Sequence, residues 1–240
     1  MEMEVPHRVH IMPQGYETDR IYKAAKKLKA DKVVLLTHPE STEQGNRCQE
    51  VVQEKLEAEN IEYDVTDCDF FNLYACLGKM LEVIRDYDGD IVSVNLSTGS
   101  KVTAVAGMMA CMTTDATPYY VRADDYGEAT VSSGVKSIDE LRAYPMDRPE
   151  RDHIRILEYI DEEGEVQLSD LIDFAEKNDL DFMMKRDVSD QKAKYGVLNE
   201  EIIEPLEEKG DITINRQGQS KLVQLTEVGE NTLQAFKHLA

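Results

Sequence analysis

The first half of the chain alternates short apolar runs with amphipathic segments. The run at residues 32–37 is almost continuously apolar, which is typical of a strand buried on both faces of a parallel sheet. Between the runs, apolar positions recur at the three- and four-residue spacing of a helix. The pattern predicts strands at 7–12, 32–37, 61–65, 90–95, 119–121 and 129–131, and helices at about 18–28, 43–60, 70–84 and 101–113. Strands alternating with helices indicate a Rossmann-like, doubly wound α/β domain with a mainly parallel sheet.

The order of elements changes after residues 145–151, which contain two prolines and are predicted to be a linker. Beyond it, the pattern predicts three helices, a β-hairpin and a last helix, near 154–160, 168–175, 191–209, 211–225 and 227–239. Three helices followed by a two-stranded wing is the order of a winged helix-turn-helix. We therefore expect an α/β domain at 1–144 and a winged helix domain at 152–240. Pro205 should kink or shorten the third helix.

The chain is strongly acidic, because it has 48 acidic and 27 basic side chains and a net charge of −21. Such acidity is common in proteins of salt-loving cytoplasm, where molar ions screen the repulsion between carboxylates. An acidic protein from an ordinary cytoplasm is the alternative. No apolar run approaches the roughly 18 to 20 residues of a membrane span, and the N-terminus does not resemble a secretory signal. We expect a cytoplasmic protein with no membrane partner.

Cysteine and histidine usage argues against a metal site. The four cysteines form no Cys-X-X-Cys pair, and the five histidines are scattered without metal-binding spacing. The cysteines are interpreted as reduced, mostly buried thiols. We expect no metal and no other cofactor.

Two loops are candidates for ligand binding, since open α/β sheets bind ligands at the carboxyl ends of their strands. Residues 12–18 follow the first strand, contain Gly15 and lead into a helix N-terminus able to receive an anion; an ordinary turn is the alternative. Residues 95–101 place hydroxyls, a glycine and Lys101 at the start of a helix of small residues. Backbone N–H groups and a cation there can cradle phosphate, although a purely structural polar cap would look similar. The P-loop and dinucleotide-binding glycine patterns are absent.

The residues of these loops resemble the two signature motifs of the CRISPR-associated Rossmann fold (CARF) domain. The first is Gln14-Gly15-Tyr16 with Asp19-Arg20, and the second is Asn95-Leu96-Ser97-Thr98-Gly99-Ser100-Lys101. With its winged helix, the whole chain resembles archaeal CARF/winged-helix transcriptional regulators, and its acidity suggests a haloarchaeal member. The second motif departs from the family in one respect, having Thr98-Gly99-Ser100 where Gly-Gly-Thr is frequent.

This resemblance implies a homodimer that binds a nucleotide, such as a cyclic oligoadenylate, across its two-fold axis. It assigns ligand binding to Gln14, Gly15, Tyr16, Thr18, Ser97, Thr98, Gly99, Ser100 and Lys101. The resulting hypothesis is a ligand-responsive transcriptional regulator rather than an enzyme, with no catalytic residue assigned. Two alternatives stay open, namely a ring nuclease that cleaves cyclic oligoadenylate and a non-catalytic dimeric interaction module.

DNA binding by the second domain would have to be local. Residues 146–240 hold 12 basic and 23 acidic side chains, a net charge of −11, so the domain lacks the overall basic footprint of DNA-binding proteins. Basic and amide side chains nevertheless gather before the third helix and in the hairpin, where they suit phosphate or base-edge contacts. The candidates for contact with double-stranded DNA are Lys185, Arg186, Gln191, Lys192, Lys194, Arg216, Gln219 and Lys221. A winged helix that only mediates dimerisation is the alternative.

Overall fold

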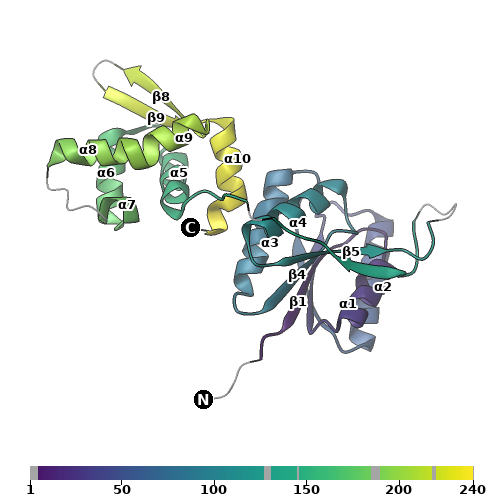
Figure 1. Cartoon of the computed structure of the whole chain (residues 1–240). Coiled ribbons are helices and arrows are strands. Elements are labelled where there is room, and N and C mark those ends of the chain that lie inside the picture. Colours follow the sequence, from purple (N-terminus) through teal and green to yellow (C-terminus); the bar gives the residue numbers. More distant parts are fainter. Residues whose placement is uncertain (1–4, 127–130, 145, 185–189, 218–219, 240) are drawn as a thin grey trace. The chain divides into compact units, whose positions relative to one another are not determined.

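The computed structural model describes residues 5–126, 131–144, 146–184, 190–217 and 220–239 (Figure 1). The chain divides into two compact units, residues 1–147 and 148–240. In the described part of the chain, no helix is long and apolar enough to cross a membrane.

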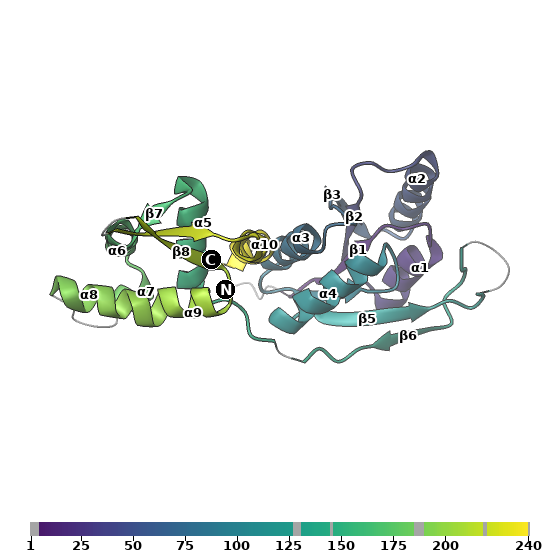
Figure 2. The ribbon, with the colours of Figure 1, turned by 90° about the horizontal axis from the view of Figure 1, so that it is seen from above.

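The N-terminal unit is a six-stranded sheet between two pairs of helices, with α1 and α2 on one face and α3 and α4 on the other (Figure 2). The strand order is β3-β2-β1-β4-β5-β6, and only the β5–β6 pair is antiparallel. This is the Rossmann order, so the predicted fold class is confirmed. The elements are β1 Arg8–Pro13, α1 Asp19–Leu28, β2 Lys32–Thr37, α2 Glu43–Ala58, β3 Glu62–Asp67, α3 Leu73–Asp86, β4 Ile91–Asn95, α4 Lys101–Thr113, β5 Thr117–Arg122 and β6 Ser137–Glu140.

Burial of the strands follows their hydrophobicity. In β1 and β2 every residue after the first is buried, as expected for central strands covered on both faces. Strand β3 has only exposed and half-buried residues because it lies at the edge of the sheet. Helix α1 packs its predicted apolar face, Ile21, Ala24 and Ala25, against this core.

The last strand of the sheet was not predicted. Residues 129 and 130 of the expected final strand lie outside the described residues, and β6 forms further on, at Ser137–Glu140. Its sequence, Ser-Ile-Asp-Glu, carries two acids and has little apolar character. An edge strand tolerates such residues because one side of its backbone faces solvent.

The C-terminal unit has the predicted winged helix order with a short extra strand and an extra helix. Strand β7 pairs with β9, and β9 pairs with β8, in a three-stranded antiparallel sheet. The elements are α5 Arg151–Glu163, β7 Val166–Gln167, α6 Leu168–Lys177, α7 Asp181–Met184, α8 Gln191–Leu198, a π-helical turn Asn199–Ile203, α9 Glu204–Glu208, β8 Ile212–Gln217, β9 Ser220–Leu225, α10 Glu227–Phe236 and a 3-10 turn Lys237–Leu239.

The third helix of this unit continues through Pro205 by way of the π-helical turn. Proline has no N–H to donate to the carbonyl of Glu201, four residues earlier. The ring of His153, on α5, takes over this role, since its Nε2 lies 2.8 Å from the Glu201 carbonyl oxygen and must donate a proton to it. The wider π turn accommodates the change in backbone pairing. His153 thereby ties the third helix to α5.

Replacement of His153 by alanine is expected to lower the free energy of unfolding of this unit by about 1 to 3 kcal/mol, since the buried hydrogen bond from the His153 ring to the Glu201 carbonyl is lost. Introducing Pro205→Ala restores a backbone N–H at position 205. In that background the same His153→Ala substitution should cost at least about 0.5 kcal/mol less. Urea unfolding of the four proteins measures both costs. An equal cost in the two backgrounds would mean that His153 acts through packing alone.

Candidate functional site

The two candidate loops meet at the centre of the sheet. Strands β1 and β4 pair in parallel from Arg8↔Ile91 to Ile11↔Val94, so their carboxyl ends lie side by side. From this point β1 continues toward β2 and β4 continues toward β5, in opposite directions along the sheet. This is the topological switch point, where sheets of this type bind their ligands.

The loops are in contact through two glycines. A Cβ atom on Gly15 would lie 2.9 Å from the backbone nitrogen of Gly99. Gly99 has a φ of +80°, and a Cβ there would lie 2.7 Å from both Pro13 Cβ and Thr103 Oγ1. Any other residue at either position would force the loops apart, so both glycines are required by this close approach.

A buried polar network fixes the loop after β4. The side chain of Asn95 is fully buried; its Nδ2 donates to the carbonyl of Arg20 at 3.0 Å, and its Oδ1 accepts from the backbone N–H of Ser97 at 3.0 Å and from the Ser97 hydroxyl. Arg20 in turn pairs with Glu17, with Nη2 3.2 Å from Oε1. The network joins the end of β4 to the start of α1.

Ser100 begins α4 with a capping box. Its Oγ accepts from the Thr103 N–H at 3.1 Å, and Thr103 Oγ1 accepts from the Ser100 N–H at 2.9 Å. The Ser100 hydroxyl donates to the carbonyl of Phe70 at 2.9 Å. Because the hydroxyls of Ser97 and Ser100 are engaged within the protein, they hold the loop in shape and do not point to a free phosphate site. Thr98 is buried, and its Oγ1 has no hydrogen-bond partner among the described residues.

The groups that remain for a ligand are the backbone N–H groups at the start of α4 and the side chain of Lys101. We find no acceptor for the N–H groups of Lys101 and Val102 in the described part of the chain. Lys101 is exposed. The helix is 13 residues long, and its N-terminal N–H groups and dipole favour an anion here.

A cavity of about 250 Å³ lies beside this junction. It is enclosed by the loops after β1, β2 and β3, the first turns of α2 and the glycine of the β4 loop. Of the predicted ligand residues, Gln14, Gly15, Tyr16, Gly99 and Ser100 line it. Thr18 begins α1 outside the lining, Ser97 and Thr98 are buried behind it, and Lys101 lies on the adjacent surface.

An aromatic wall of this cavity was missed by sequence analysis. The ring of His38 packs edge-on against Phe70 and Phe71, with centroid distances of 5.9 and 5.1 Å. His38 Nδ1 accepts from the Glu40 N–H at 3.1 Å, so Nε2 carries the proton, 3.6 Å from an Asp69 carboxylate oxygen. These residues follow β2 and β3, so the rule that selected the loops after β1 and β4 applies to them too.

Cysteine chemistry plays little part at the cavity. Among the four free cysteines, Cys48 is half-buried and its thiol donates to the Tyr16 carbonyl at 3.9 Å. Burial, helped by the nearby Glu17 carboxylate, raises the pKa of the Cys48 thiol. A raised pKa keeps it protonated and a poor nucleophile.

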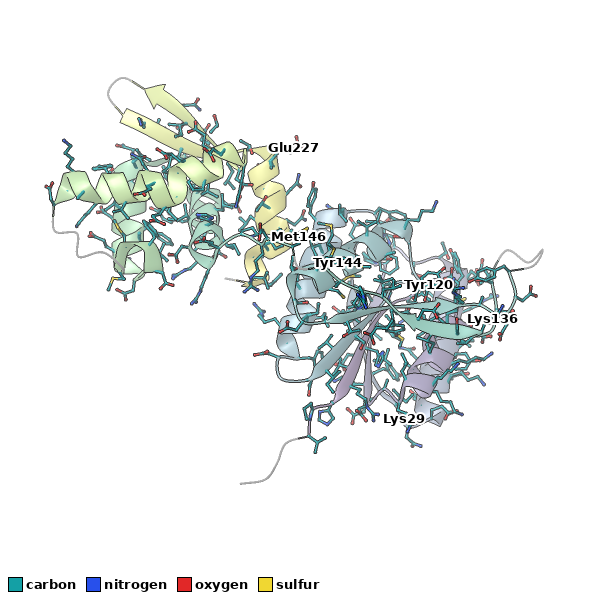
Figure 3. The ribbon with its side chains drawn as sticks, viewed as in Figure 1. Lys29, Tyr120, Lys136, Tyr144, Met146 and Glu227 are labelled. Atoms are coloured by element: carbon teal, nitrogen blue, oxygen red, sulfur yellow. The ribbon has the colours of Figure 1, made fainter. Side chains whose placement is uncertain are left out.

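A larger cavity, of about 610 Å³, opens at the opposite end of the strands, near Lys29 (Figure 3). Its charges largely neutralise one another, as Arg8 pairs with Asp31 at 3.0 Å and Lys26 with Glu59 at 2.7 Å. It lies at the amino ends of the strands, where open α/β sheets do not place their ligand sites. We therefore consider the smaller cavity the better candidate despite its size.

The winged helix unit exposes part of the predicted DNA-binding set. Gln191 and Lys192 are exposed in the first turn of α8, and Lys221 is exposed on β9. Lys194 is engaged in an ion pair with Glu176 on α6, which makes it a weaker candidate. The register of the hairpin places Arg216 opposite Lys221. Lys185, Arg186 and Gln219 lie outside the described residues, as does the side chain of Arg216.

Acidic residues limit which part of the third helix can approach DNA. Glu200, Glu201, Glu204, Glu207 and Glu208 occupy its second half. A phosphate backbone would be repelled there. Within the described part of the third helix, the beginning of α8 is therefore better suited to a DNA contact than the second half.

Two different family models match the two units of this chain. Residues 8–126 match the family model described as HFX_2341_N:-like, N-terminal, and residues 152–237 match the model of the DUF6293 C-terminal winged helix domain. An uncharacterized protein of Methanocaldococcus jannaschii, MJ1513, is 32% identical over 124 residues, which are 47% of this chain and 37% of the relative. That relative comes from a methanogen, and the salt-loving origin stays a prediction.

Two solved structures are similar to this chain at low identity and low TM-score. Can2 from Sulfobacillus thermosulfidooxidans, in complex with cyclic tetra-adenylate, is 14% identical with a TM-score of 0.42, over 97% of this chain and 65% of that one. Csm6 from Enterococcus italicus, bound to cyclic hexa-2'-fluoro-hexa-dAMP, is 15% identical with a TM-score of 0.41, over 51% of this chain and 35% of that one. The chain spans less than two thirds of the length of each of these relatives.

Proposed function

We propose that this protein is a ligand-responsive, DNA-binding transcriptional regulator. Its α/β unit senses a nucleotide of the cyclic oligoadenylate class, and its winged helix unit binds double-stranded DNA. The observation that carries the proposal is the contact of Gly15 with Gly99, which joins the two CARF-like loops at the switch point of the sheet. The proposal also draws on the winged helix domain in the same chain.

The ligand's phosphates would bind at the start of α4. The N–H groups of Lys101 and Val102 supply two donors, and the Lys101 ammonium supplies a positive charge beside them. Gly15 and Gly99 let the two loops lie against each other, which brings the start of α4 next to the first loop. In this proposal the hydroxyls of Ser97 and Ser100 act by positioning that backbone.

A homodimer formed by the α/β units would complete the site. Helix α4 is apolar on nearly every side, which is typical of a buried helix. Its inner face packs on the sheet through Ala106 and Ala110, yet Val105 is 51% exposed and Met108 and Met112 are only half-buried. Lys101 and Val105 are one helical turn apart and share a face. A second copy covering Val105 would therefore bring two phosphate sites together.

Contact with DNA would come from short-range groups. The negative charge of residues 146–240 repels phosphate at long range, so binding has to rely on individual cations that reach the backbone. Lys192 on α8 and Lys221 on the hairpin are exposed and basic. They are the described residues best suited to this role.

Replacement of Lys101 by alanine should weaken binding of cyclic tetra-adenylate by about 1.5 to 3 kcal/mol, the range of a charge-assisted hydrogen bond. Stability should not change, because Lys101 is exposed. Titration calorimetry measures the affinity. Lys136→Ala, which removes an exposed lysine near β6 (Figure 3), is the matched control and should bind as the wild type does.

If the wild-type protein does not bind cyclic tetra-adenylate, the proposed ligand is wrong. If Lys101→Ala binds it with the affinity of the wild type, the phosphates do not bind at Lys101. Mass spectrometry of the recovered nucleotide tests the remaining alternative. A linear product would make the protein a ring nuclease.

Substitution of Val105 by glutamate should convert the expected dimer into a monomer, since a charge would be buried in an apolar contact. Val65→Glu is the matched control, because Val65 is similarly exposed but lies on the edge strand β3. Light scattering in molar KCl should give a dimer for the wild type and for the Val65 variant. A monomeric wild type at micromolar concentration would contradict the proposed assembly.

Replacing both Lys192 and Lys221 by glutamine should weaken binding to specific and random DNA alike. Each phosphate contact releases about one counterion, so the slope of log K against log salt should flatten by roughly two units. Lys194→Gln is the control on the same helix and should change the slope little, because Lys194 already pairs with Glu176. An unchanged slope in the double variant would show that these lysines do not contact phosphate.

A further inference from the structure

A buried cation lies next to the loop junction. Arg20, in the first turn of α1, is 6% exposed. Its Nη2 pairs with Glu17 at 3.2 Å, its Nη1 donates to the Val121 carbonyl at 3.5 Å, and its Nε is buried without a partner in the described part of the chain. A guanidinium has five N–H donors and meets anions at about 2.7 to 2.9 Å, frequently through two donors at once. Arg20 therefore has donors to spare for a second anion.

The carboxylate of Glu17 separates this cation from the cavity beside the loop junction. Glu17 lines the cavity, whereas Arg20 is not among the described lining residues. In the same ion pair the Glu17 side chain is 24% exposed and the Arg20 side chain only 7%. An anion that enters the cavity therefore meets the negative charge of Glu17 before it can reach Arg20.

The same carboxylate lies at the contact between the two loops. A Cβ atom on Gly15 would lie within 2.9 Å of both Glu17 Oε2 and the backbone nitrogen of Gly99. Two atoms that lie this close to one point are near neighbours, so Glu17 Oε2 is beside the loop that leads into α4. The chain thus holds a negative charge of its own in the region where the proposed function requires a phosphate.

We propose that Glu17 is an internal competitor of the ligand: its carboxylate pairs with Arg20 in the free protein and is displaced when a phosphate takes its place. Carboxylate and phosphate oxygens accept from the same guanidinium fork, so one can replace the other. The exchange gives up one partly exposed contact, and the incoming phosphate can use more of the donors of Arg20. The inference rests on the proposed function, because it takes a phosphate-bearing ligand to bind at the loop junction.

Glu17→Gln tests the competition, since it keeps the length of the side chain and removes its charge. Calorimetry should show that the variant binds cyclic tetra-adenylate at least about fivefold more tightly than the wild type, because the ligand no longer displaces a carboxylate from Arg20. Urea unfolding should show a less stable protein, because the buried guanidinium loses its counter-ion. A gain in affinity together with a loss of stability distinguishes a competitor from an ion pair that only supports the fold.

Glu40→Gln is the matched control, because Glu40 also lines the cavity but is exposed and forms no ion pair among the described residues. It removes the same charge from the same cavity, so it measures the general electrostatic effect on an anionic ligand. Its affinity for cyclic tetra-adenylate should stay within about twofold of the wild type.

Arg20→Met tests whether the gain comes from the guanidinium. In that background Glu17→Gln should tighten binding no more than Glu40→Gln does, because no guanidinium is left for the ligand. Circular dichroism checks that the Arg20→Met protein folds. If it does not, Arg20→Lys takes its place as the background, since it keeps the charge without the fork and should at least halve the gain.

The outcomes separate the competitor from the proposed function. Unchanged or weaker binding by Glu17→Gln, a gain equal to that of Glu40→Gln, or a gain that persists in full without Arg20 would overturn the competitor. If Lys101→Ala still weakened binding in that case, the proposed phosphate site would stand without it. If neither the wild type nor Glu17→Gln bound cyclic tetra-adenylate, both proposals would be wrong.

Discussion

The close approach of Gly15 and Gly99 is the constraint on which the α/β unit's proposed chemistry depends. It exists because β1 and β4 are neighbours at the centre of the sheet while their following helices lie on opposite faces. A side chain on either glycine would separate the loops. The start of α4, the cavity and the aromatic wall are all arranged around this contact, so their relative positions follow from it.

Around this contact the protein uses its polar side chains for support and leaves backbone groups for a ligand. Asn95 and the hydroxyls of Ser97 and Ser100 are engaged in hydrogen bonds within the protein. The first N–H groups of α4 remain unpaired in the described chain. Backbone donors held in this way need little rearrangement to meet an anion, which lowers the entropic cost of binding.

The parts of the structure that depend on burial could be predicted from the sequence. The continuous apolar run of β2 marks a central strand, and the helix of small residues at 101–113 begins and ends as expected. Strand β6 could not be found in this way, because its Ser-Ile-Asp-Glu sequence is tolerated only at an edge. The winged helix order was predictable, but the passage of its third helix through Pro205 depends on His153, 52 residues away in the sequence.

The candidate site was predictable only in outline. The two loops could be identified by their place after central strands, and the resemblance to CARF domains assigned the hydroxyls of Ser97 and Ser100 to the ligand. Their partners, Asn95 and the carbonyl of Phe70, depend on tertiary contacts that no local pattern reports. His38 and Phe71 come from other strands and were missed for the same reason. The ion pair of Lys194 with Glu176 likewise joins two helices and removes an apparent DNA contact.

In the proposed mechanism, a nucleotide on the α/β unit controls DNA binding by the winged helix unit. The decisive measurement is the DNA affinity of the full chain with and without saturating cyclic tetra-adenylate. Coupling between two sites of one protein is typically worth about 1 to 3 kcal/mol, so DNA affinity should change roughly five- to 150-fold. The change should disappear in a Lys101→Ala protein that is no longer saturated. Identical DNA affinity with the nucleotide bound and absent would mean that the nucleotide does not control DNA binding.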